Sequence, residues 1–173
     1  MKDALMLFAE YNRKVNEEML LILKTVTPER LLETGNYYYS SVMGLLNHIM
    51  LGDIIWLRRF ADNFAPVSYF NEKLKGYQFT ALNIILFDTV EALLKHREKL
   101  DGYLTELVHA LTEEDLARTV NYNDFHGVPQ QKHAYAMLLH VFNHQTHHRG
   151  EITLLLDEMG VDNDYSNLVS KVD

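Results

Sequence analysis

Three prolines, at positions 28, 66 and 129, divide the chain into long proline-free segments. A proline inside a helix removes a hydrogen bond and clashes with the preceding turn, so helices are expected between the prolines. Within these segments apolar residues recur every three or four positions, as they do along one face of an α-helix. This spacing predicts four long helices, over residues 3–24, 37–60, 82–110 and 131–159, and a short helix that starts near Thr112.

Two connections between the predicted helices are longer than turns. Residues 61–79 are rich in aromatic side chains, and residues 119–130 contain Asn, Gly and Pro, which favour a small strand-like hairpin. Loops of this length in a compact domain are often lids or binding segments. Four amphipathic helices with long crossover connections predict an all-α fold, a four-helix bundle that forms a single domain over residues 1–173.

Nine consecutive residues of the last predicted helix carry four of the nine histidines, His140, His144, His147 and His148. Residues four apart on a helix lie on the same face with Cβ atoms about 5–6 Å apart, so two such imidazoles can bind one divalent metal ion. His140, His144 and His148 cannot all bind the same ion, because the outer two are separated by about 12 Å along the helix axis. Spacing alone leaves open which adjacent pair is used. The alternative is that these are histidines at the edge of the core, hydrogen-bonded to the backbone or to each other.

A catalytic zinc site usually takes three protein ligands, and His48 is the best candidate for the third. It lies on an otherwise apolar face of the second predicted helix, with Gly44 and Gly52 one turn before and after it. Glycine inside a helix costs about 0.5–1 kcal/mol relative to alanine. The two glycines therefore indicate either space kept clear for a metal, water or substrate, or a close approach between helices. Asp53 lies about 140° away from His48 around the helix and is expected to pair with an arginine of this or a neighbouring helix.

Composition narrows the classes of partner and ligand. The formal charge is −8, with 24 acidic and 16 basic side chains, which disfavours binding to nucleic acid or to an anionic membrane. The absence of cysteine leaves His, Asp and Glu as the strong metal ligands. No apolar run approaches the roughly 18–20 residues of a membrane span, and the amino terminus is too acidic for a secretory signal. These features predict a soluble, cytoplasmic protein.

Two motifs resemble those of the DinB-like family: Asn47-His48 followed by Asp53, and His144 followed by His148-Arg149-Gly150. The resemblance spans nearly the whole chain. It implies a four-helix bundle in up-down-down-up order that is often dimeric, so a homodimer is expected. It also implies a divalent metal on three histidines, which by motif are His48, His144 and His148.

The resemblance leaves His140 and His147 outside the set of metal ligands. The family motif continues with glutamine after the glycine, whereas this chain has Glu151. That carboxylate can orient a ligand, act on a bound water, or remain a solvated charge at the rim.

Zinc and nickel both suit three imidazoles. Related bundles with assigned activities use the metal to activate a low-molecular-weight thiol. The resemblance thus implies a thiol-dependent S-transferase or a hydrolase that acts on a small molecule, with a solvent-open cleft walled by residues 61–79 or 119–130. The alternative is a non-enzymatic metal sensor or a structural metal, closed by a fourth protein ligand such as His140, His147 or Glu151. In either case the ligands must be unprotonated, so metal should be lost below about pH 6.

Overall fold

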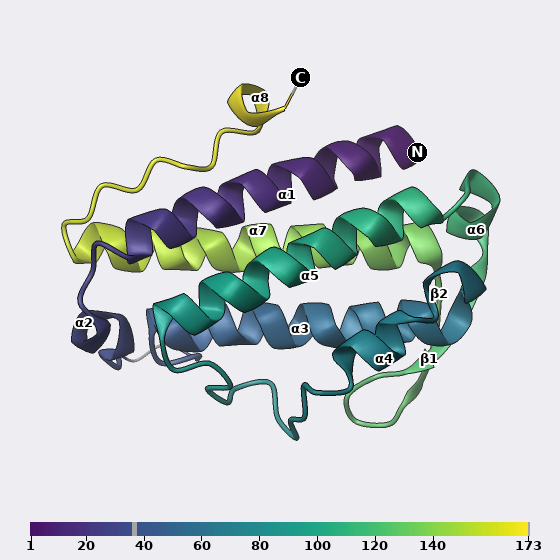
Figure 1. The fold of residues 1–173 in the computed structure, drawn as a ribbon, viewed down its shortest axis with the longest axis horizontal. Coiled ribbons are helices and arrows are strands. Elements are labelled where there is room, and N and C mark those ends of the chain that lie inside the picture. Colours follow the sequence, from purple (N-terminus) through teal and green to yellow (C-terminus); the bar gives the residue numbers. More distant parts are fainter. Residues whose placement is uncertain (36–37, 173) are drawn as a thin grey trace.

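The computed structural model describes residues 1–35 and 38–172, which form a mostly helical fold with one small antiparallel sheet (Figure 1). The long helices are α1 (Lys2–Leu23), α3 (Val42–Asn63), α5 (Val90–Ala110) and α7 (Ala134–Glu158). The short elements are α2 (Pro28–Leu32), the 3-10 helix η1 (Ala65–Val67), α4 (Phe70–Leu74), α6 (Glu113–Ala117), β1 (Thr119–Asn123), β2 (Pro129–His133) and α8 (Leu168–Lys171). None of the helices in the described ranges is long and apolar enough to cross a membrane.

The four long helices lie side by side around one apolar core. Helices α1 and α7 run in one direction and α3 and α5 in the other (Figure 1). Helices α1 and α3 each pack against both α5 and α7, and the apolar faces predicted from the helical spacing point inward. The metal-ligand candidates therefore come from two neighbouring, oppositely directed helices, α3 and α7.

The starts of α3 and α5 differ from the sequence prediction. Helix α3 begins at Val42, where the Ser41 side chain accepts a hydrogen bond from the Gly44 N–H; the predicted start at Tyr37 lies outside the described residues. Helix α5 begins at Val90 after the capping residue Thr89, so the prediction of helix over residues 82–89 was wrong.

The side chain of Asn47 explains why residues 82–89 are not helical. Its Oδ1 accepts hydrogen bonds from the backbone N–H groups of Leu86 and Phe87, each 2.8 Å long, and its Nδ2 donates to the Phe87 carbonyl over 2.9 Å. Asn47 is fully buried on α3, so these bonds hold the segment, a series of turns and bends, against that helix. The polar groups of the segment are satisfied by a distant residue, which local spacing does not reveal.

The hairpin expected within residues 119–130 forms, and β1 pairs antiparallel with β2. Its turn runs from Asp124 to Val128, with Gly127 at a φ of +80° that favours glycine. Residues 131–133 belong to β2, so α7 starts three residues later than predicted. The connection over 61–79 contains the end of α3, η1 and α4.

A buried ion pair lies at the centre of the helices. Asp53 on α3 accepts a 2.5 Å hydrogen bond from Nη1 of Arg97 on α5, so its partner is an arginine of a neighbouring helix. Gln145 Nε2 donates to both carboxylate oxygens of Asp53 over 2.9 Å. Arg97 Nη2 lies 2.9 Å from Asp101 Oδ1 but is not aligned for a hydrogen bond. These contacts join α3, α5 and α7 in the core.

The same network reaches α1 through Arg149. Its Nη1 donates to the side-chain oxygens of Asn12 and Asn16, and the amide nitrogens of both asparagines donate to Gln145 Oε1. Gln145 and Arg149 each follow a histidine of the metal motif in the sequence. By fixing the face of α7 that points to the core, they fix the direction in which His144 and His148 project.

Candidate metal centre

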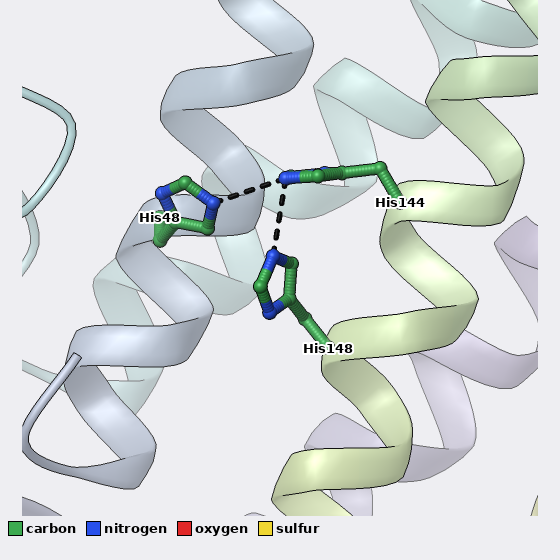
Figure 2. A group of neighbouring side chains, drawn as sticks. All are labelled: His48, His144 and His148. Atoms are coloured by element: carbon green, nitrogen blue, oxygen red, sulfur yellow. Dashed lines mark hydrogen bonds between the residues drawn. The ribbon is translucent and has the colours of Figure 1, made fainter. Parts of the chain in front are cut away.

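Three histidine side chains from α3 and α7 converge on one point. Figure 2 shows the rings of His48, His144 and His148 directed toward one another. Nε2 of His144 lies 3.0 Å from Nε2 of His48 and 3.2 Å from Nε2 of His148. Tetrahedral zinc with Zn–N bonds of about 2.0–2.1 Å separates its nitrogen ligands by about 3.3 Å. Two nitrogen pairs are thus spaced nearly as in such a site, and all three nitrogens lie within 4.8 Å of one another, so the group could hold one ion.

Hydrogen bonds on the far side of two rings fix the state of the converging nitrogens. Nδ1 of His48 donates to the carbonyl of Leu82 over 3.0 Å, and Nδ1 of His148 donates to Glu151 Oε2 over 2.7 Å. In neutral rings the Nε2 atoms of His48 and His148 therefore carry lone pairs. His144 Nε2 has at most one hydrogen to offer to both of them. A cation between the rings fits this excess of lone pairs.

Burial keeps two of these histidines neutral. It lowers the pKa of His48 to about 4, although the hydrogen bond to Leu82 acts in the opposite direction. Burial also lowers the pKa of His144 to about 3, with repulsion from protonated His148 and His48 adding to the effect. Neutral imidazole is the form that binds a metal. The residues present fit a divalent ion.

The two glycines of α3 have different roles. A Cβ atom on Gly52 would lie 3.2 Å from Cε1 of His144, so this glycine keeps space for a candidate ligand. A Cβ atom on Gly44 would collide with the backbone carbonyl of Tyr39. That close approach allows the Tyr39 ring to stack on His48, with 3.8 Å between ring centroids. Gly52 thus makes room for a side chain of α7, whereas Gly44 allows close approach of Tyr39, a loop residue and not another helix as the sequence suggested.

Glu151 contacts two histidines at once. Its Oε2 accepts the hydrogen bond from His148, and its Oε1 lies 3.2 Å from Nε2 of the exposed His147. A carboxylate behind a metal-binding histidine fixes the tautomer and raises the basicity of the ring. Glu151 is thus positioned to orient His148. It contacts His147 at the rim of the site.

An open cleft of about 250 Å³ lies beside His48 and His144. Its walls come from α3, from α7, from Leu82 and from the β1–β2 hairpin. The hairpin is the 119–130 segment proposed as a wall from the sequence, whereas no residue of the 61–79 connection lines the cleft among those described. His140 also lines it, with its ring centroid 5.0 Å from that of Trp56 and 5.7 Å from that of His144.

Sequence reasoning missed the residues that reach the site from non-helical segments. Tyr39 covers His48, and the carbonyl of Leu82 sets its tautomer. The sequence prediction assigned Leu82 to a helix, in which its carbonyl would accept a hydrogen bond from a backbone N–H of the next turn. Asn47, next to His48, was the available signal, because an amide on the core side of a helix needs hydrogen-bond partners. Asn47 finds one partner in Met43 of its own helix and the others in the backbone of Leu86 and Phe87.

The sequence model of the DinB family matches residues 1–172. The chain belongs to the DinB family. It is 22% identical over 165 residues to Protein DinB of Bacillus subtilis (strain 168), covering 92% of this chain and 88% of that protein. Its fold is similar to the crystal structure of a DinB-like protein from Bacillus cereus ATCC 10987, with a TM-score of 0.54 and 19% identity. That match covers 87% of this chain and 89% of the other.

Proposed function

We propose that this DinB-family chain is a metal-dependent enzyme that holds one divalent ion, zinc or nickel, on His48, His144 and His148. The observation that carries the proposal is that Nε2 of His144 lies 3.0 Å from Nε2 of His48 and 3.2 Å from Nε2 of His148, beside an open cleft. The proposal includes a four-helix bundle in up-down-down-up order, supported by the directions of α1, α3, α5 and α7 (Figure 1).

We propose a thiol-dependent S-transferase or a hydrolase that acts on a small molecule. When bound, such an ion supplies Lewis acidity, which brings the pKa of a water or thiol ligand toward neutrality. The protein's own groups prepare the site: Leu82 and Glu151 direct the lone pairs of His48 and His148 inward. Tyr39 covers one face of His48 and shields it from water.

The alternative is a non-enzymatic metal sensor or a structural metal. It requires a closed shell with a fourth protein ligand. Among the described residues, two groups bring ligand atoms together: His48, His144 and His148, and at the rim His147, His148 and Glu151. The first group includes none of His140, His147 and Glu151 as a fourth ligand. The adjoining cleft leaves room for an external molecule on that side, which supports the enzyme.

Two assays on the zinc-loaded protein test the proposed activity. One follows transfer of the thiol of cysteine to 1-chloro-2,4-dinitrobenzene, and the other follows hydrolysis of 4-nitrophenyl acetate. The proposal predicts turnover in at least one assay that is lost with chelator and in His144→Ala. Binding of one zinc ion without metal-dependent turnover in either assay would favour the sensor or structural role.

The homodimer and the cytoplasmic location stay predictions. Leu139 and Leu154 are large apolar side chains exposed on α7, 43% and 57% accessible, and they offer a surface for a second copy. Sedimentation equilibrium should give about twice the chain mass of 20.2 kDa. A mass that stays at one chain at micromolar concentration would contradict the dimer.

A further inference from the structure

The cleft beside the three histidines ends at a cation. Arg59 lines the cleft together with His48, and both residues lie on the same face of α3. The two residues are eleven positions apart, so their Cα atoms are separated by about 16 Å along the helix axis. The cleft therefore joins the candidate metal ligands at one end to a guanidinium at the other.

Aromatic rings hold the guanidinium of Arg59 in place. Its Cζ lies 4.4 Å from the centre of the Trp56 ring and 4.5 Å from that of Tyr122, and the two rings contact each other edge to face. Its Nη2 donates to the Asn123 carbonyl over 3.0 Å. A guanidinium ordered by aromatic contacts loses little conformational freedom when it binds a ligand.

Most donors of Arg59 remain free for a ligand. An arginine side chain has five N–H donors, and the bond to Asn123 is the one that the Arg59 guanidinium makes within residues 1–35 and 38–172. The nearby carboxylate of Asp124 forms no ion pair with it in those ranges. Asp124 instead accepts hydrogen bonds from the His126 and Val128 backbone and from Gln130. Asp124 thus closes its own turn and partly offsets the charge of Arg59 without occupying its donors.

The wall between the two ends carries aromatic rings. The ring of His140 lies between those of His144 and Trp56, at centroid distances of 5.7 Å and 5.0 Å. A cleft of about 250 Å³ is slightly smaller than most ligand sites, so it suits a small molecule.

We propose that the cleft binds an elongated small molecule with an oxyanion at one end and a metal-binding donor at the other. The oxyanion, a carboxylate or a phosphate-type group, pairs with Arg59, and a flat or apolar body lies along Trp56 and Tyr122. The donor, such as a thiol, reaches the ion between the histidines. This inference rests on the proposed metal site. The net charge of −8 repels anions in general, so a preference for an anionic ligand must arise locally from Arg59.

Three thiols that differ only in the remote group provide the test. These probes are phenylmethanethiol, 4-(mercaptomethyl)benzoate and 4-(mercaptomethyl)phenylphosphonate, titrated into cobalt(II)-loaded protein. Thiolate binding to cobalt is read from its charge-transfer absorption. A charge-assisted bond to a guanidinium predicts that at least one anionic probe binds about 10- to 100-fold more tightly than phenylmethanethiol. The carboxylate and phosphonate arms show which oxyanion fits the site.

Variants assign the preference to Arg59. In Arg59→Gln the preference should disappear while phenylmethanethiol binding and cobalt uptake stay unchanged, and Arg59→Lys should keep part of it. Arg13→Gln removes the same charge from an exposed residue of α1, and this variant should keep the full preference for the anionic probe. Cobalt uptake without any preference in the wild type, or without binding of either anionic probe, would overturn this inference and leave the metal site intact. Absence of cobalt uptake would refute the proposed function and this inference together.

Discussion

Replacing Asp53 by asparagine tests whether the buried ion pair stabilises the arrangement that positions the histidines. Asp53 and Arg97 have side chains that are 1% and 4% exposed, so neither charge is screened by water. Removing one partner of a buried ion pair typically costs about 3–5 kcal/mol, because the other charge is left unpaired. Asp101 stays near Arg97 and offsets part of this loss. We therefore expect Asp53→Asn to lower the free energy of unfolding by about 3 kcal/mol.

For a chain of this length, about 3 kcal/mol corresponds to a fall in Tm of about 6–12 °C. Urea and thermal unfolding with chelator present measure the change without a contribution from bound metal. Asp62→Asn is the matched control, since Asp62 lies on the same helix, is exposed and hydrogen-bonds Asn71. It should change the free energy by less than about 0.5 kcal/mol.

Equal effects of the two substitutions would refute the ion-pair reasoning. Burial raises the pKa of Asp53, and the nearby guanidinium of Arg97 opposes that rise. If Asp53→Asn were nearly silent, the carboxyl would be protonated in the folded protein, and burial would have outweighed the charge of Arg97.

Three further predictions concern the metal centre. Gly52→Ala should weaken metal binding, because the new methyl would lie 3.2 Å from Cε1 of His144. In the control Gly102→Ala the methyl meets nothing within 4 Å and should stabilise the fold by about 0.5–1 kcal/mol. Metal titration and thermal unfolding compare the two variants. Without metal, stability should fall as pH drops below 6.5, since the folded pKa values of His48 and His144 are about 4 and about 3 and the unfolded chain takes up these protons first. Each histidine contributes up to about 1.4 kcal/mol per pH unit to the fall in the free energy of unfolding. Urea unfolding with chelator at pH 7, 6 and 5 should therefore show a smaller fall for His48→Gln than for the wild type. Glu151→Gln should weaken cobalt binding about 10- to 100-fold, and an unchanged affinity would contradict its orienting role.

The long helices were predictable because their information is local. Apolar spacing located α1, α3, α5 and α7, with errors concentrated at the ends. The largest error, residues 82–89, arose because Asn47 binds the backbone of that segment from 40 residues away. No local pattern distinguishes such a segment from the first turns of a helix.

The candidate site was predictable only in part for the same reason. Helical spacing placed His144 and His148 on one face, and the apolar face of the second predicted helix made His48 the candidate third ligand. The motif resemblance then chose the pair His144 and His148. The structure brings these three residues together, with Glu151 behind His148. Tyr39 and Arg59 depend on how a loop and a hairpin fold over α3, so their contacts follow from tertiary structure and not from residue spacing.

The most direct test of the metal centre is the metal content of protein purified without a histidine tag. Elemental analysis should give about one equivalent of zinc or nickel per chain. The ion should be lost in His48→Ala and in His148→Ala and kept in His133→Ala, which changes an exposed histidine at the end of β2. Absence of metal after reconstitution at pH 8, or equal metal content in all three variants, would contradict the three-histidine site.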